Sequence, residues 1–272
     1  MIVRAFTGGL VAGPIAALCL FSAAAAQAPA AASALPVSAS PPAVLSPPAA
    51  EGVQTPAPQA PPPLPFAAEI AHFAELDAAA PPQACSFLFV GSSTIRFWRS
   101  LDQDMAPYPV INRGFGGSKI EDVDLYFDKV VAPYKPRAIF FYAGENDLSA
   151  GETVETVVAN FERFMTMKTA ELGDAPVYFI SLKPSKLRLA QMPLQAEVNA
   201  RIKALAETRA DLRYVDVIPA MLDQGAPKDI YIADGLHMNP DGYALWTGIV
   251  RPVLEREAQD GRACGDTAIA TR

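Results

Sequence analysis

Short apolar runs alternate with amphipathic stretches through the central and C-terminal parts of this 272-residue chain. The apolar runs are rich in β-branched and aromatic residues and carry few polar positions, which is typical of parallel strands buried on both faces. Five strands are predicted, over residues 86–90, 109–112, 137–142, 176–180 and 212–217.

Apolar residues recur at helical spacing between and around these runs. The pattern predicts helices over residues 66–79, 120–126, 153–172 and 196–210, and a last helix that starts at Asp241, as its N-cap, and reaches Glu257. Pro252 is expected to kink the last helix, and the first helix is expected to pack outside the first strand. Strands separated by helices of this length indicate right-handed crossovers. The predicted fold is therefore α/β, a three-layer sandwich in which helices cover both faces of a five-stranded parallel sheet.

The first 26 residues have the features of a secretory signal peptide. Arg4 gives a positive start, residues 8–22 are apolar, and three alanines precede the expected cleavage site. Cys19 lies in the apolar segment, but the bulky Leu18 before it disfavours a lipidation site. No other stretch reaches the ~18 apolar residues needed to cross a bilayer. We therefore expect a secreted or periplasmic protein with no transmembrane segment in the mature chain.

Residues 27–66 are mostly Ala, Pro and Ser, with Glu51 as the only charge. Such a composition cannot bury enough surface to offset its ordering entropy, so a disordered linker is predicted. It is either a spacer that reaches past an envelope layer or a dispensable connection. Residues 67–260 form the predicted folded domain, and residues 261–272 a C-terminal tail.

Net charge bears on the binding partners of the protein, and cysteine content bears on its disulfide bonds. The net charge is -7 and no basic cluster occurs, so no nucleic-acid partner is expected. Once the signal peptide is removed, only Cys85 and Cys264 remain, one before the first strand and one after the last helix. In an oxidising compartment they either form a disulfide that joins the two ends of the domain or stay as two thiols.

Polar residues of unusual type follow the predicted strands. Ser93 comes after the first strand, Gly117 after the second and Asn146 after the third, while Asp234 and His237 lie beyond the fifth. The carboxyl ends of parallel strands meet at one edge of a sheet, so these side chains are expected to converge. A serine nucleophile needs an imidazole as base, and the imidazole needs a carboxylate to hold it. The only other histidine, His72, lies on the polar side of the first helix and is expected to be a surface residue.

The four segments that contain Ser93, Gly117, Asn146 and the pair Asp234 and His237 resemble, in this order, the conserved segments of the SGNH hydrolases, also called the GDSL esterase family. The chain is most similar to bacterial members that have Gly-Ser-Ser in place of Gly-Asp-Ser, and the resemblance covers nearly all of residues 84–257. It implies a five-stranded parallel sheet of flavodoxin-like order, and an ester hydrolase that requires no cofactor and no metal.

The resemblance also implies roles for individual residues. Ser93 takes the place of the nucleophile, His237 that of the general base, and Asp234 that of the carboxylate that supports the imidazole. The backbone N–H groups of Ser93 and Gly117 and the side-chain amide of Asn146 take the places of the oxyanion-hole donors.

Three alternatives remain open at this stage. Ser92 is a second possible nucleophile, although its more natural role is to replace the aspartate of the turn through a hydrogen bond. Gly116 competes with Gly117 for the oxyanion hole, and both glycines are compatible with a tight turn. Asp147 is expected to cap a turn rather than to take part in the chemistry.

Two further groups of residues have both a functional and a structural interpretation. Three aromatic residues either line an acyl pocket or pack in the core: Phe97, Trp98 and Phe115. Three basic residues after the fourth strand either meet an anionic head group or are solvated: Lys183, Lys186 and Arg188.

Together these observations predict a serine esterase that hydrolyses short acyl esters, with acetyl preferred, through an acyl-serine intermediate. Its substrate is a small-molecule ester, an acylated carbohydrate or a lipid. The alternatives are a lysophospholipase or thioesterase of the same fold, and a non-catalytic envelope-binding module. A metal hydrolase is disfavoured because the chain lacks a second usable histidine or a cysteine pair. An α/β-hydrolase is disfavoured because Ile95 stands where the Gly-x-Ser-x-Gly motif needs its second glycine.

Overall fold

The computed structural model describes residues 64–260. The predicted signal peptide, the linker up to residue 63 and the C-terminal tail lie outside the described residues. Cys85 takes part in a disulfide bond, and Cys264, its predicted partner, lies outside the described residues, so the pairing stays a prediction.

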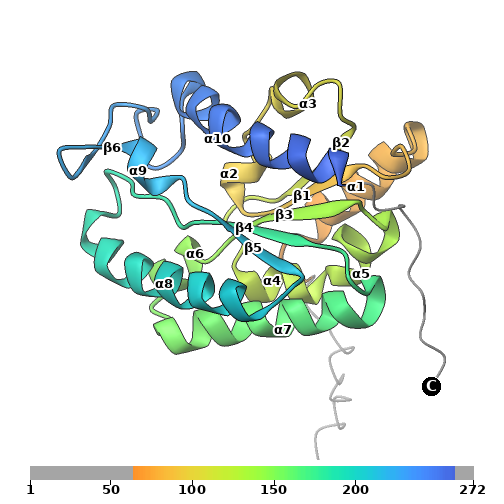
Figure 1. Cartoon of the computed structure of the whole chain (residues 1–272), viewed down its shortest axis with the longest axis horizontal. Coiled ribbons are helices and arrows are strands. Elements are labelled where there is room, and N and C mark those ends of the chain that lie inside the picture. The colour runs from red at the N-terminus through yellow and green to blue at the C-terminus, as the bar shows by residue number, and fades with distance from the viewer. Residues whose placement is uncertain (1–63, 261–272) are drawn as a thin grey trace, which may run out of the picture. The chain divides into compact units, whose positions relative to one another are not determined.

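A five-stranded sheet forms the centre of the domain, and all of its neighbouring strands run parallel (Figure 1). The strand order is β2-β1-β3-β4-β5, which confirms the predicted flavodoxin-like order and the α/β class. The strands are β1 (Phe87–Gly91), β2 (Val110–Gly114), β3 (Ala138–Tyr142), β4 (Val177–Ile180) and β5 (Leu212–Val215).

Helices cover both faces of this sheet (Figure 1). On the lower face in Figure 1 lie α4 (Ile120–Leu125), α5 (Phe127–Val130), α6 (Glu145–Ser149), α7 (Val154–Leu172) and α8 (Met192–Thr208). On the upper face lie α2 (Ser93–Arg96), α3 (Leu101–Asp104), α9 (Ile218–Met221) and α10 (Pro240–Gln259). The remaining elements are α1 (Ala67–Ala79), the 3₁₀ turns η1 (Ala132–Tyr134) and η2 (Leu189–Gln191), and the hairpin strands β6 (Leu222–Asp223) and β7 (Ala226–Pro227).

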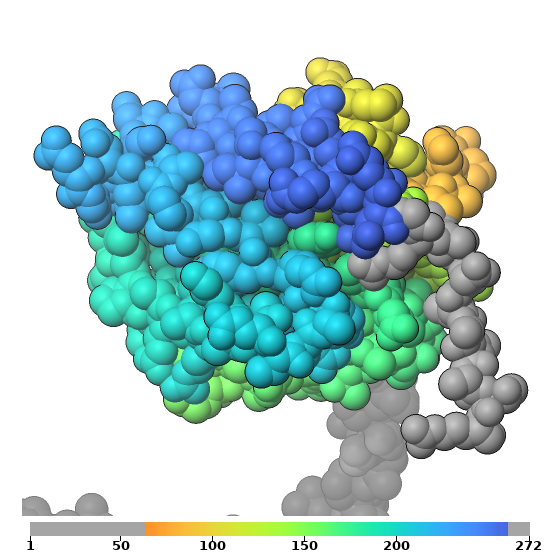
Figure 2. Space-filling model, in the orientation of Figure 1, coloured from red at the N-terminus to blue at the C-terminus, as the bar shows by residue number. Residues whose placement is uncertain are grey.

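Alternate side chains of each strand enter two separate hydrophobic cores. Leu88 and Val90 of β1 pack against the layer that contains α4, α5, α7 and α8. Phe87 and Phe89 point the other way and pack with residues of α2, α3, α9 and α10. Because both faces of the sheet are buried, all five residues of β1 and all five of β3 are apolar or glycine. Figure 2 shows α10, in dark blue, forming the outer surface above the sheet next to α3, in yellow.

Two predicted helix starts and one packing prediction were wrong. The N-cap of α10 is Asn239 rather than Asp241: its side chain accepts a hydrogen bond from the N–H of Gly242, and the proline that follows needs no acceptor. The helix then continues through Pro252. The helix predicted from residue 196 begins at Met192, because Pro193 at its first turn is compatible with a helix start.

The first helix lies beside β2, the edge strand, rather than outside β1. Arg113 of β2 forms an ion pair with Asp77 of α1, and its guanidinium lies 4.9 Å from the centre of the Phe73 ring. Phe66, which precedes α1, makes an edge contact with Phe115, just after β2, with 5.2 Å between the ring centres. This helix therefore covers the exposed edge of the sheet.

Candidate active site

The loops after β1, β2 and β3 and the loop before α10 meet at the carboxyl edge of the sheet. The turn after β1 depends on Gly91, which has φ +134° and whose added Cβ would lie 1.9 Å from the carbonyl oxygen of Tyr142. Only glycine allows the two chains to approach this closely. The turn delivers Ser93 as the first residue of α2.

Ser93, His237 and Asp234 form a hydrogen-bonded chain. The Ser93 Oγ lies 2.9 Å from the His237 Nε2, and the His237 Nδ1 lies 2.6 Å from the Asp234 Oδ2. An ionised carboxylate can only accept, so Nδ1 carries the ring proton and Nε2 is left to accept the Ser93 hydroxyl proton. The His237 side chain is 20% exposed, so the hydrogen-bonded group of three residues is accessible to a ligand.

Asp234 holds both the imidazole and the loop around it. Its Oδ1 accepts hydrogen bonds from the N–H groups of Leu236 at 2.8 Å and His237 at 2.9 Å, while its Oδ2 accepts from the ring. Partial burial opposes ionisation, but these hydrogen bonds outweigh it and hold the pKa of Asp234 below its usual range. The carboxylate is therefore ionised at neutral pH.

Ser92 is buried, and it is the hydroxyl of Ser93 that reaches the imidazole. The Ser92 side chain makes no capping hydrogen bond to α2, so the predicted replacement of a turn aspartate by this hydroxyl was wrong. Its backbone holds the turn instead: the N–H donates to the carbonyl of Tyr142, and the carbonyl accepts from Ile95 and Arg96.

The glycine loop after β2 brings one unused N–H to this edge. Gly116 donates its N–H to Glu69 at 3.4 Å, whereas within residues 64–260 neither Gly117 nor Ser93 donates its backbone N–H to a protein acceptor. Gly117 has φ +78°, a left-handed conformation that favours glycine. A Cβ added there would meet nothing within 4 Å, so space is open beside it. Gly117 therefore fits an oxyanion donor better than Gly116.

Asn146, in the first turn of α6, lies beside the same space. A cavity of about 440 Å³ is lined by both Gly117 and Asn146, together with residues that precede α1 and residues at the start of α4, but not by Ser93, His237 or Asp234. The Asn146 Nδ2 donates to the carbonyl of Ser118 at 2.9 Å, and its Oδ1 accepts from the Arg188 Nη2 at 2.8 Å. One hydrogen of Nδ2 is left for a further acceptor.

Lys183 forms a buried link that sequence reasoning missed. Its side chain has no exposure, and its Nζ lies 3.2 Å from the Glu145 carboxylate and donates to the carbonyl of Leu236 at 3.0 Å. Desolvation lowers the pKa of Lys183, although Glu145 opposes this. The ammonium joins the loop of Asn146 to the loop of His237. A lysine after an apolar strand gave no sign of burial; only the acidic residue next to Asn146 was a usable hint.

The other two basic residues of this loop behave differently. Lys186 is exposed and pairs with Asp229 at 2.6 Å, in agreement with the solvated alternative. Arg188 is half-buried and contacts Asn146 rather than solvent alone.

Asp147, which follows Asn146 in α6, is fully buried. Its Oδ1 accepts from the N–H of Ile120 at 3.0 Å, at the start of α4, and within the described part of the chain its Oδ2 has no hydrogen-bond partner. Burial raises the pKa of Asp147 to about 7. It supports the start of α4 from the interior of the protein, whereas the sequence suggested that it caps a turn.

The three aromatic residues considered for an acyl pocket differ in burial and in their neighbours. Phe97 is half-buried, and its ring meets the His237 ring edge-on with 4.9 Å between the centres. Trp98 and Phe115 are buried, Trp98 among other aromatic rings with its Nε1 donating to Asp104 and Phe115 against Phe66. Their burial assigns both to the core rather than to an acyl pocket.

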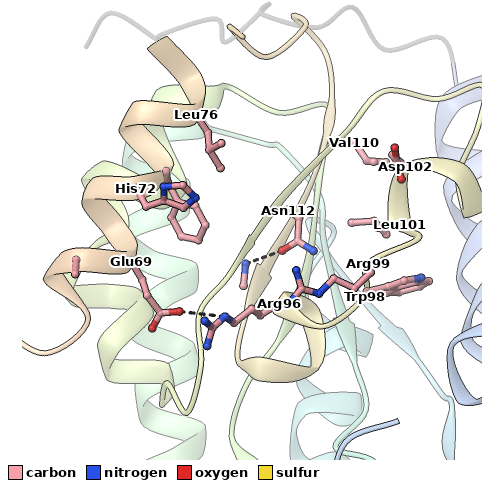
Figure 3. A pocket seen from close by; sticks show the side chains of 13 residues that line it. Glu69, His72, Leu76, Arg96, Trp98, Arg99, Leu101, Asp102, Val110 and Asn112 are labelled. Atoms are coloured by element: carbon pink, nitrogen blue, oxygen red, sulfur yellow. Dashed lines mark hydrogen bonds and ion pairs between the residues drawn. The ribbon is translucent and has the colours of Figure 1, made fainter. Parts of the chain in front are cut away.

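A second cavity, of about 670 Å³, lies between α1, β2 and the segment after Ser93, and none of the triad residues lines it (Figure 3). Figure 3 shows Arg96 reaching Glu69 at one end, where the ion pair measures 3.2 Å. Asn112 lies between the two sides, and its Oδ1 accepts from the N–H of Gly114. His72 lines the α1 side and is exposed, as predicted.

Within residues 64–260, no group of three His, Cys, Asp or Glu side chains is placed to hold a metal ion. No helix in the same range is long and apolar enough to cross a membrane.

Comparison with known proteins gives one family and one fold. The model of the GDSL-like lipase/acylhydrolase family matches residues 89–245. No curated protein matches the chain. Among solved structures, the chain is similar to a candidate platelet activating factor from Streptococcus pneumonia, with 20% identity, a TM-score of 0.61 and coverage of 69% of this chain and 92% of that one.

It is also similar to a GDSL-like lipase from Bacteroides thetaiotaomicron, with 20% identity, a TM-score of 0.59 and coverage of 70% and 98%. A carbohydrate esterase family 3 protein from Talaromyces cellulolyticus matches with 17% identity, a TM-score of 0.54 and coverage of 65% and 100%. At these identities the likeness establishes the shared fold.

Proposed function

The chain belongs to the GDSL-like lipase/acylhydrolase family, whose model covers more than half of it, and on that basis we propose that this carboxylic ester hydrolase works through an acyl enzyme formed on Ser93. The observation that carries the proposal is the 2.9 Å contact between the Ser93 Oγ and the His237 Nε2, with Asp234 on the other ring nitrogen.

In the proposed mechanism, the Ser93 Oγ attacks the ester carbonyl while its proton passes to the His237 Nε2. Asp234 stabilises the imidazolium that forms. The imidazolium then protonates the leaving alcohol as the bond from carbon to the ester oxygen breaks. A water molecule attacks the acyl-serine with His237 again as base, which releases the acid and restores the serine. No cofactor takes part in this sequence.

The negative charge that develops on the carbonyl oxygen is assigned to three donors. These are the backbone N–H groups of Ser93 and Gly117 and the side-chain amide of Asn146. Neither N–H is used by a protein acceptor within residues 64–260, and Asn146 has one amide hydrogen to spare. Each such donor is worth about 10²–10³ in rate in other hydrolases, because it needs no reorientation as charge develops.

We further propose that the acyl group is short, with acetyl preferred, on a carbohydrate or a simple ester. Two of the aromatic side chains considered for an acyl pocket are buried in the core, so Phe97 alone of the three offers a surface near His237. The likeness to a carbohydrate esterase family 3 protein favours the same class of substrate. A lysophospholipase or thioesterase would instead prefer long acyl chains or a thiol leaving group.

The features of the first 26 residues support a secreted or periplasmic enzyme. The linker is proposed to play no part in turnover. Deleting residues 28–62 should therefore leave kcat on small esters unchanged, and a large fall would refute this part of the proposal.

The central test uses p-nitrophenyl esters of two to twelve acyl carbons with purified protein. We expect the highest kcat/KM on acetate. Ser93→Ala and His237→Ala should lose nearly all activity, whereas Ser92→Ala, the matched control, should keep most of it. A rate that Ser93→Ala leaves unchanged would point to a non-catalytic binding module, and inactivation by Ser92→Ala alone would move the nucleophile by one residue.

A further inference from the structure

Arg188 makes a contact with Asn146 that the proposed mechanism does not yet use. The residue lies between β4 and η2 and is half-buried. Its Nη2 donates to the Asn146 Oδ1 at 2.8 Å. No carboxylate among residues 64–260 forms an ion pair with this guanidinium, so its charge is not neutralised there by an acidic side chain.

The two neighbours of the Asn146 amide allow only one orientation of that group. The carbonyl oxygen of Ser118 can only accept, so it must face the Nδ2, and a guanidinium can only donate, so it must face the Oδ1. Rotating the amide by half a turn would oppose two oxygens on one side and two sets of N–H groups on the other. The contacts with Ser118 and with Arg188 thus favour the same orientation, and Arg188 fixes the Oδ1 end of the amide.

This orientation matters because a misplaced amide would present the wrong atom to the substrate. In the observed arrangement, one Nδ2 hydrogen is used by Ser118 and the second is left over. Asn146 and Gly117 line the same cavity, and the proposed function assigns that hydrogen to the oxyanion together with the N–H of Gly117. An Oδ1 in its place would repel an oxyanion.

The positive charge adds a second effect. A charged donor on the carbonyl oxygen of an amide draws electron density away from its nitrogen, which strengthens the N–H as a donor. The contact also restricts the side-chain rotation of Asn146 before substrate arrives, so the donor needs no reorganisation in the transition state.

We propose that Arg188 is a positioning residue of the oxyanion hole, whose guanidinium holds the Asn146 amide with its N–H toward the substrate and strengthens it as a donor. This inference rests on the proposed function. In it, Arg188 acts through Asn146 and touches no substrate atom, so the effect of removing Arg188 must disappear when Asn146 is absent.

A double-mutant cycle tests this with a neutral substrate, p-nitrophenyl acetate. Arg188→Ala should lower kcat about tenfold with KM changed less than twofold, and Asn146→Ala should lower kcat about 10²–10³-fold. The double variant should be no more than twofold slower than Asn146→Ala. Equal effects of Arg188→Ala with and without Asn146 would overturn the proposal.

Four comparisons separate positioning from other roles. Arg188→Lys keeps a charged donor and should recover part of the lost kcat, and millimolar guanidinium should partly rescue Arg188→Ala but not Asn146→Ala. Arg201→Ala removes an arginine from an exposed ion pair on α8 and should leave kcat unchanged. Each variant should unfold in urea at the same midpoint as the parent protein; a shift confined to Arg188→Ala that matches its loss of activity would reduce the residue to a structural role and overturn the proposal.

An anionic substrate distinguishes a positioning role of Arg188 from direct binding of a substrate anion. With the p-nitrophenyl hemiester of succinic acid, a positioning role predicts the same fold-loss in kcat as with acetate. A rise in KM for the hemiester alone, with acetate turnover unaffected, would show that Arg188 binds a substrate anion and would refute the positioning role. Activity that survives Ser93→Ala would instead refute the proposed function, so the two failures are distinguishable.

Discussion

Removing one partner of the buried Lys183–Glu145 pair should destabilise the protein strongly. The Lys183 ammonium is fully buried and lies 3.2 Å from the Glu145 carboxylate. At that distance, with an effective dielectric constant of about 20, the attraction is about 5 kcal/mol. Taking each ion out of water costs several kcal/mol, so the intact pair contributes little net stability. A single substitution leaves the other charge buried without its partner.

We therefore expect Lys183→Met to lower the free energy of unfolding by about 3–5 kcal/mol. The double variant Lys183→Met with Glu145→Leu should recover all but about 1 kcal/mol, which corresponds to the lost hydrogen bond to the carbonyl of Leu236. Both values can be measured by urea unfolding at pH 7. Because Leu236 precedes His237, the double variant should also turn over more slowly than the parent protein despite its recovered stability.

Lys186→Met is the matched control, since this lysine lies on the same loop in an exposed ion pair. It should change the free energy of unfolding by about 0.5 kcal/mol or less. The reasoning is refuted if Lys183→Met costs no more than this control, or if the double variant is as unstable as the sum of its two single substitutions.

Three further predictions concern single side chains near the site. Asp234→Asn keeps the oxygen that accepts from the loop but loses the acceptor for the ring, so kcat should fall by about 10²–10⁴ with KM little changed in steady-state assays; a fall of less than tenfold would show that the carboxylate does not support His237. Gly117→Ala should lower kcat because alanine resists φ +78°, at a cost of about 1 kcal/mol in urea unfolding. Gly116→Ala should instead disturb Arg96, whose Nη1 lies 2.4 Å from an added Cβ. An unaffected kcat in Gly117→Ala would exclude the N–H of Gly117 from the oxyanion hole. Asp147 has a folded pKa of about 7, above its unfolded value of about 3.9, so the folded protein binds more protons between these values and this group makes stability fall as pH rises from about 4 to 7. Asp147→Asn should remove a fall on the order of 4 kcal/mol from the pH profile of unfolding, and a profile identical to that of the parent protein would contradict the assignment.

The sheet was predictable because its residues have only one role. Both faces of β1 and β3 are buried, so their residues are apolar or glycine, and such a short continuous apolar run is typical of a buried parallel strand. Helix ends were harder, since Asn239 and Asp241 are both good caps and only the accepting contact with Gly242 decides between them. Elements of two to four residues, such as α3 and the β6–β7 hairpin, are too short to show a period.

The residues at the strand ends were predictable as a set because parallel strands bring their carboxyl ends together. The contacts among loops were not. Lys183, Lys186 and Arg188 lie within six positions of one another and look alike in sequence, yet one is buried, one is exposed and one meets Asn146. Their environments depend on how distant loops pack, which no local pattern records.

The segment that carries Asp234 and His237 is closed by its own backbone. Tyr231 and Met238 form an antiparallel bridge, and within it Ile232 donates its N–H to the carbonyl of His237. Neighbours in sequence thus hold the Asp234 carboxylate and the His237 imidazole together, whereas this imidazole, the proposed base, meets Ser93, the proposed nucleophile, across 144 positions. Catalysis consequently depends on one junction between remote parts of the chain. A small displacement of this segment from Ser93 would abolish activity while leaving the secondary structure unchanged. Turnover is therefore a more sensitive measure of the native conformation than circular dichroism.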